Sequence, residues 1–80
     1  MNNIYFEKLK SEILWSATCT NKNANDKDIN RNHVNYGCTT TYASVLRDFG
    51  FSVDVPVYGD NELLRIPYIE IDGIKIQLER

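Results

Sequence analysis

The segment RIPYIEIDGIKIQL (residues 65–78) decides the expected fold of this 80-residue chain. Its centre, Asp72-Gly73, separates two runs in which apolar and polar residues alternate, and this dipeptide is a strong signal for a two-residue type I′ turn. A two-residue turn sets the pairing register of an antiparallel hairpin. The expected pairs on the apolar face are Ile71 with Ile74, Ile69 with Ile76, and Pro67 with Leu78.

The opposite face of this hairpin is polar and aromatic. Tyr68 and Gln77 lie on it, and Glu70 is expected to face Lys75. Upstream, residues 51–58 also alternate between apolar and polar side chains, which predicts a half-buried strand. Pro56 lacks a backbone N–H, so we expect that strand at an edge of the sheet.

Two helices are expected before the strands. Residues 4–17 repeat apolar side chains at helical spacing, with Trp15 off the stripe. Residues 39–50 form the better marked helix, because three threonines supply N-cap candidates and Gly50 stands where a left-handed C-cap is wanted. The buried stripe expected in the first helix is Phe6, Leu9, Ile13 and Ala17, and that expected in the second is Tyr42, Val45, Leu46 and Phe49.

Between these helices the apolar periodicity disappears. Residues 18–37 are dominated by Asn, Asp, Thr and Lys, whose short polar members compete with helical hydrogen bonding. We therefore expect a long polar loop over about 18–37. Long loops in compact domains are often functional.

These elements predict one small α+β domain spanning residues 1–80. Two helices would pack on one face of a small three-stranded antiparallel sheet, in the order α-α-β-β-β, because both element types must bury an apolar side. The side chains expected to meet in the core are Ile69, Ile71, Ile74, Ile76 and Leu78 from the hairpin, and Val45, Leu46 and Phe49 from the second helix.

Composition narrows the function classes. The net charge is -2, which disfavours general nucleic-acid binding because phosphate contacts require a basic surface. No apolar run approaches the length of a membrane span, and no signal-peptide pattern is present, so a reducing, cytoplasmic location is expected with both thiols free. No motif for catalysis, a cofactor or a metal emerges, which favours a non-enzymatic protein.

The function expected from the sequence is the binding of another protein, with modulation or inhibition of that protein as the outcome. Rigid aromatic and acidic side chains on one sheet face suit a basic or nucleic-acid-binding partner protein. The residue usage is typical of an AT-rich genome, which favours a phage or mobile-element accessory protein, and a second copy of the chain is an alternative partner. The predicted binding residues are Asp54, Tyr58, Tyr68, Glu70, Lys75 and Gln77, with the polar segment 21–35 as second choice.

A thiol-dependent function is the first alternative. Cys38 is expected at the start of the second helix, where the helix dipole stabilises a thiolate, and His33 and Cys19 could assist it. The run GCTTTYASVLRDFGF (37–51) resembles the nucleophile helix of papain-like cysteine peptidases, although their downstream histidine has no counterpart here. The order from Cys38 to RIPYIEIDG is also similar to glutaredoxins, without a CxxC pair and with Pro67 as the expected cis-proline.

The second alternative is DNA binding. A helix followed by three short strands is similar to a winged helix, in which TTTYASVLRDFG (39–50) would be the recognition helix. Arg47 is its basic residue and Asp48 follows directly, so the helix has no basic face. Direct nucleic-acid binding is therefore less favoured than protein binding.

Overall fold

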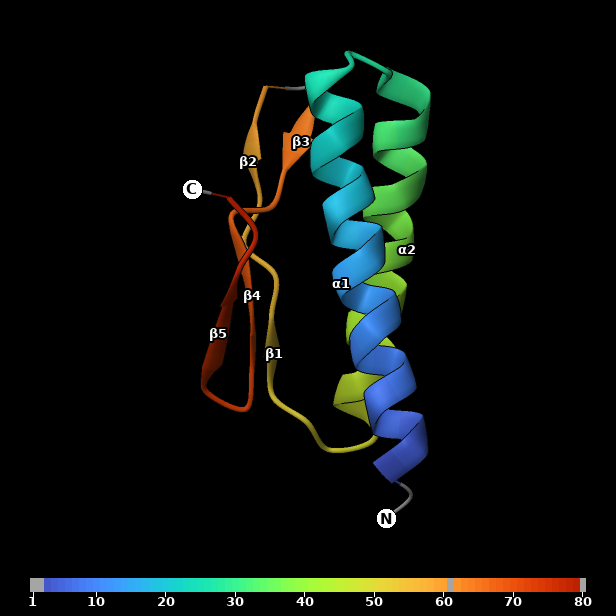
Figure 1. The fold of residues 1–80 in the computed structure, drawn as a ribbon, viewed down its shortest axis with the longest axis vertical. Coiled ribbons are helices and arrows are strands. Elements are labelled where there is room, and N and C mark those ends of the chain that lie inside the picture. The colour runs from blue at the N-terminus through green and yellow to red at the C-terminus, as the bar shows by residue number, and fades with distance from the viewer. Residues whose placement is uncertain (1–2, 61, 80) are drawn as a thin grey trace.

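Two long antiparallel helices and five short strands make up the computed structural model, which describes residues 3–60 and 62–79. The helices lie side by side on one side of the strands (Figure 1). The α+β expectation is confirmed, but the described residues form two more strands than expected. The bounds are α1 Asn3–Asn25, α2 Ile29–Asp48, β1 Val53–Asp54, β2 Tyr58–Gly59, β3 Leu64–Arg65, β4 Tyr68–Ile71 and β5 Ile74–Gln77.

The larger sheet is antiparallel, with strand order β1-β4-β5. The hairpin register is confirmed, with Ile71 opposite Ile74 and Ile69 opposite Ile76. Asp72 and Gly73 have φ angles of 50° and 85°, as a type I′ turn requires. The β1 strand lies at the sheet edge as expected, although it ends at Asp54, two residues before Pro56.

The strand expected over residues 51–58 is divided between two sheets. After β1 the chain leaves the larger sheet, and β2 pairs with β3 in a separate two-stranded sheet. Tyr58 pairs there with Arg65. The expectation that Tyr58 extends the same strand as Asp54 was therefore wrong.

The polar loop expected over residues 18–37 was also wrong, because that segment is almost entirely helical. The α1 helix continues to Asn25, and α2 begins at Ile29. Lys27, with φ 58°, turns the chain between them, and the Asp28 side chain caps α2 by accepting from the N–H of Arg31. The two helices of this hairpin are thus longer than the apolar periodicity indicates.

Small polar side chains continue the buried stripe where apolar residues stop. The hydroxyl groups of Ser16 and Thr39 lie 2.8 Å apart between the helices, and Thr20 donates to the carbonyl of Ser16. Such side chains satisfy their hydrogen bonds locally and let two helices approach closely. The buried polar residues of the helices are Ser16, Thr20, Asn21, Asn32 and Thr39.

Two buried asparagines hold the segment that contains β3. The amide of Asn21 donates to the carbonyl of Ile66 and accepts from its N–H, both at 2.8 Å. Asn32 makes the same paired contact with Leu64, at 2.9 and 2.8 Å, and also donates to the carbonyl of Thr20. Each side-chain amide thus pairs with a main-chain residue as a neighbouring strand would.

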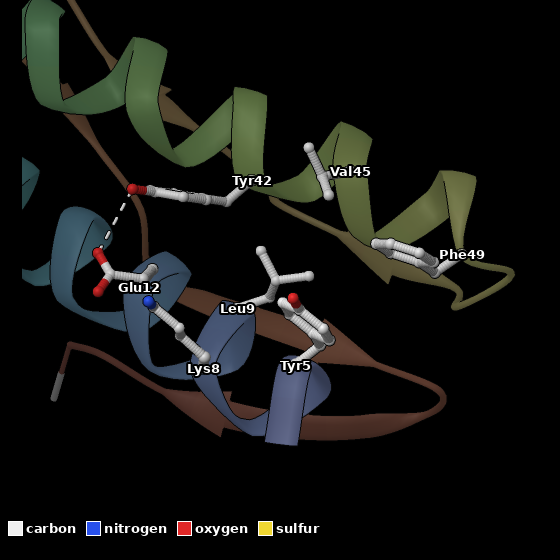
Figure 2. A pocket seen from close by; sticks show the side chains of 7 residues that line it. All are labelled: Tyr5, Lys8, Leu9, Glu12, Tyr42, Val45 and Phe49. Carbon is white, nitrogen blue, oxygen red and sulfur yellow. Dashed lines mark hydrogen bonds between the residues drawn. The ribbon is translucent and has the colours of Figure 1, made fainter. Parts of the chain in front are cut away.

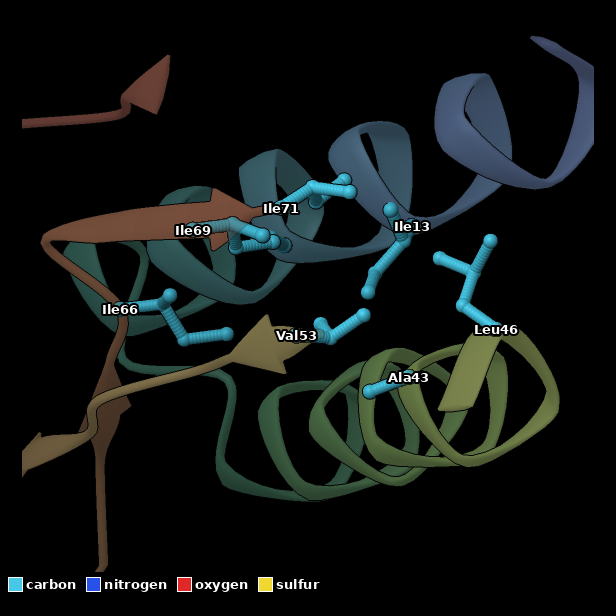
Figure 3. Packing of buried hydrophobic residues seen from close by; sticks show 8 residues of the cluster. Ile13, Ala43, Leu46, Val53, Ile66, Ile69 and Ile71 are labelled. Atoms are coloured by element: carbon cyan, nitrogen blue, oxygen red, sulfur yellow. The ribbon is translucent and has the colours of Figure 1, made fainter. Parts of the chain in front are cut away.

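The apolar core lies between the helices and the inner face of the larger sheet (Figure 3). The expected contributions of Ile13, Ala17, Leu46, Ile69 and Ile71 are confirmed. The buried cluster comprises these residues with Ala43, Val53 and Ile66.

Two expected core residues are instead exposed: Phe49 by 61% and Ile74 by 68%. Ala43, rather than Val45, faces the core, because the buried side of α2 is rotated from the stripe expected. The C-cap is confirmed: Gly50 has φ 96°, and the N–H groups of Gly50 and Phe51 bond to the carbonyls of Arg47 and Leu46.

Replacing Asn32 by Ala should lower the free energy of unfolding by at least about 2 kcal/mol, because buried main-chain groups would lose their partners. Urea unfolding measures this change. The matched control is Asn30→Ala, since Asn30 is exposed on the same helix and its replacement should shift stability by less than about 0.5 kcal/mol. Equal stability of the two variants would show that the Asn32 contact does not hold the fold.

Candidate functional site

The outer face of the larger sheet, turned away from the helices, holds five of the six predicted binding residues. Across the three strands, Asp54 is opposite Glu70, and Glu70 is opposite Lys75. Tyr68 is opposite Gln77 on the same face. We call the set Asp54, Tyr68, Glu70, Lys75 and Gln77 the sheet outer face.

Aromatic and charged groups on the sheet outer face contact one another. The Lys75 ammonium lies 4.4 Å from the centre of the Tyr68 ring, which is a cation–π contact. Asp54 and Glu70 place two carboxylates on neighbouring strands, with Lys75 as the cation beside them. The face is therefore mildly acidic. Its basic group, the Lys75 ammonium, lies over the Tyr68 ring.

Tyr58 is not part of this face. Its hydroxyl donates to Glu79 at 2.7 Å, and this hydrogen bond raises the pKa of Tyr58 above its ordinary value. Glu79 also lies 3.8 Å from the guanidinium of Arg65, which donates in turn to the Asn25 side chain at 2.7 Å. These contacts tie the two-stranded sheet to the end of α1 and to the C-terminal segment.

The thiol alternative loses its geometric basis. Cys38 lies in the middle of α2 rather than at its N-terminus, so the expected stabilisation by the helix dipole was wrong. His33 is five residues earlier, about 140° around the helix, and contacts the carbonyl of Glu62 at 2.7 Å. Cys19 is half-buried on α1, and both thiols are free.

Pro67 follows a trans peptide bond, so the expected cis-proline was wrong. Within residues 3–60 and 62–79, no three His, Cys, Asp or Glu side chains are placed to hold a metal ion.

The segment 21–35, the second-choice binding surface, buries both Asn21 and Asn32 and so cannot present them to a partner.

For the DNA-binding alternative, the decisive side chain is Arg47. Its guanidinium donates twice to the carbonyl of Val53, at 3.1 and 2.8 Å. This contact fixes the connection from α2 to β1. It also holds the Arg47 guanidinium against the main chain of Val53. No basic stripe results on α2, where Arg31 is paired with Asp28.

A further candidate site lies on the side of the helix pair that does not contact the sheet, and the sequence did not indicate it. A groove of about 490 Å³ runs between the first half of α1 and the second half of α2. Figure 2 shows the Tyr5, Leu9 and Val45 side chains between the two ribbons, with Phe49 at one end and Tyr42 at the other. Lys8 and Glu12 complete the lining.

A second hollow of about 410 Å³, lined by Val34, Cys38 and Tyr42 among others, adjoins this groove through Tyr42. Trp15 lies one turn beyond Glu12 on α1 and is 68% exposed. Val34 is 65% exposed and Tyr5 is 64% exposed. We call the set Tyr5, Leu9, Trp15, Val34, Tyr42, Val45 and Phe49 the helix-back face.

Charge is sparse on the helix-back face. The Tyr42 hydroxyl donates to Glu12 at 3.3 Å, and the charge of Glu12 is the main cause that raises the pKa of Tyr42. Lys8 forms no ion pair within the described residues. The groove therefore presents apolar surface with one unpaired cation at its edge.

Sequence reasoning missed this face because it assigned Leu9, Tyr42, Val45 and Phe49 to the core, against which Leu9 and Tyr42 do pack in part. Tyr42, Val45 and Phe49 occur at helical spacing, which is typical of a buried stripe. The buried side of α2 is instead formed by Asn32, Thr39, Ala43 and Leu46. One residue in the sequence did indicate an exposed apolar surface. Trp15 lies off the apolar stripe of α1 and could not be placed in the core.

No protein-family model, curated protein or solved structure matches the chain, so its function is inferred from geometry and chemistry. No helix in the described ranges is long and apolar enough to cross a membrane.

Replacing Glu12 by Gln should lower the pKa of Tyr42 toward its ordinary value, because the charge that disfavours the phenolate is removed. The measurement is the pH dependence of the Tyr42 ring signal in NMR. Since the folded-state pKa is raised, this interaction favours folding below the ordinary tyrosine pKa and is lost as pH rises through the folded value. Glu7→Gln, the same charge change at an exposed position of α1, should leave Tyr42 unaffected.

Proposed function

We propose that this chain is a non-enzymatic protein-binding module that uses the helix-back face to hold an apolar segment of another protein. The observation that carries the proposal is the clustering of exposed apolar side chains around one groove. Tyr5 and Phe49 line the groove and are each more than 60% exposed, as are Val34 in the adjoining hollow and Trp15 one turn beyond Glu12. Large contiguous apolar patches on small domains mark interaction sites.

The composition of the face supports this proposal. Aromatic side chains are enriched in binding interfaces because they bury a large rigid area at a small entropic cost, and charged groups are depleted from interface centres. The groove holds three aromatic residues, Tyr5, Tyr42 and Phe49, and its charged members are Lys8 and Glu12. Glu12 is already engaged by Tyr42.

The shape and charge of the groove favour an amphipathic helix as the bound segment. Two antiparallel helices form a trough that a third helix can fill with side chains at i, i+3, i+4 and i+7. Lys8 would then pair with an acidic side chain of that helix. A helical segment with apolar and acidic residues on adjoining faces therefore matches the site.

The direct test uses a fluorescein-labelled designed helical peptide with Leu at the apolar positions and Glu beside them, read by fluorescence anisotropy. The Tyr5→Ser/Phe49→Ser double variant should weaken binding at least tenfold, equivalent to about 1.4 kcal/mol, while its melting temperature changes little. Val57→Ala, which alters a partly exposed apolar residue outside the face, is the control.

Charge exchange tests the orientation of the peptide. Lys8→Glu should weaken binding of the Glu-bearing peptide and strengthen binding of a peptide with Lys at the same positions. Both effects should diminish as salt rises. If neither peptide binds the parent protein, or if the Tyr5→Ser/Phe49→Ser variant binds as well as the parent, the helix-back face is not the binding site.

The second candidate surface is the sheet outer face, which the neighbouring carboxylates of Asp54 and Glu70 favour for a basic partner. Asp54→Asn/Glu70→Gln should weaken binding of a Lys- and Arg-rich peptide by at least tenfold, more strongly at low salt. Glu7→Gln/Asp48→Asn removes the same charge from exposed helix positions and should have a smaller effect. Equal losses in both double variants would indicate only a net-charge effect.

A further inference from the structure

The outer edge of β5 has no strand beside it within the described residues. The larger sheet ends at β5, whose other edge pairs with β4. The opposite edge of the sheet is protected, because β1 has two residues and Pro56 follows shortly after it. β5 has four residues and contains neither proline nor glycine. An unprotected edge of this kind is a template for another strand.

The hairpin geometry determines which main-chain groups face outward. In a two-residue hairpin the residues flanking the turn, Ile74 and its partner, exchange both hydrogen bonds, and the pattern then alternates along the strand. The N–H of Leu78 donates to the carbonyl of Pro67, which agrees with this alternation. The main-chain groups of Lys75 and Gln77 therefore point away from β4, toward the open edge.

Apolar surface lies beside the same edge. A groove of about 140 Å³ separates β5 from the start of α1, with Phe6 and Lys10 on one side and Ile74 and Ile76 on the other. Ile74 is on the inner, apolar face of the sheet, yet it is 68% exposed beside this groove. A strand added at this edge would place every second side chain in that groove.

We propose that two copies of this chain pair through their β5 strands, antiparallel, with the twofold axis at Ile76. In this register each Lys75 is opposite Gln77 of the second copy, and such a pair exchanges two main-chain hydrogen bonds. The outward-pointing groups of both residues are then used. Two three-stranded sheets become one continuous sheet, independently of any ligand on the helix-back face.

The side chains of β5 are complementary in this register. On the inner face, Ile76 meets Ile76 of the second copy, and Ile74 meets Leu78 of the second copy. On the outer face, Lys75 lies beside Gln77 of the second copy, so no like charges are directly opposite each other across the edge. The Lys75 ammonium lies over Tyr68 on β4, so it does not cover the outer edge of β5 where the second copy would pair.

Neighbouring registers are less favourable. A shift of two residues in one direction sets Lys75 against Lys75 of the second copy, which is repulsive. A shift in the other direction requires the main chain of Glu79, whose N–H already donates to Pro67. The pairing strands are short, so the interface is small and the dimer should depend on protein concentration.

Sedimentation velocity from micromolar to millimolar protein tests the proposal, together with amide hydrogen exchange followed by NMR. The expected result is a monomer–dimer equilibrium in which the amides of Lys75 and Gln77 become slower to exchange as concentration rises. The Ile74 and Ile76 amides should be protected at every concentration. A monomer throughout, or a dimer whose protection changes at Tyr5 and Phe49 instead, would overturn the proposal.

Gln77→Pro and Gln77→Ala form a matched pair for the edge itself. Both remove the side chain, but only Pro removes the outward N–H, so Gln77→Pro should raise the dimer dissociation constant at least tenfold more than Gln77→Ala. Ile74→Lys provides a second variant at an exposed position and should also raise the constant at least tenfold, with circular dichroism confirming the fold of each. Unchanged dimerisation in a folded Gln77→Pro or Ile74→Lys variant would overturn the proposal.

Discussion

The paired contacts of Asn21 and Asn32 with the main chain of Ile66 and Leu64 are the constraint on which the rest of the structure depends. These amides stand where a neighbouring strand would otherwise be needed, and thereby fix the short β3 segment against the helices. Because one asparagine comes from each helix, the same contacts also set how α1 and α2 lie relative to one another. Burial of these polar groups is tolerated because their hydrogen bonds are satisfied.

This arrangement has a consequence for the apolar residues. Ser16, Thr20 and Thr39 occupy buried positions of the helices that apolar side chains would otherwise fill. The apolar core is therefore small, and a core in a domain of this size supplies only about 3–5 kcal/mol of net stability. The large aromatic side chains of the helices are left on the opposite side, where they form the helix-back face.

The two proposed interactions use different parts of the molecule. The helix-back face offers side-chain surface with little charge, which suits an amphipathic helix. The β5 edge offers main-chain hydrogen bonds beside a narrow apolar groove, which suits an added strand. The groove of the helix-back face lies between α1 and α2 and contains no residue of the sheet (Figure 2), so a dimer formed through β5 would leave both helix-back faces available for a partner.

The sequence by itself determined the hairpin, its register, the Gly50 cap and the apolar stripe of α1, because each depends on neighbouring residues. It did not determine that residues 18–37 are helical, since buried Thr and Asn carry no apolar periodicity and are stabilised by partners as distant as Ile66. Nor could it show which side of α2 is buried: Phe49 and Ala43 both fit a helical stripe. Only the tertiary packing, by requiring small side chains between close helices, directed Ala43 inward and Phe49 to the surface.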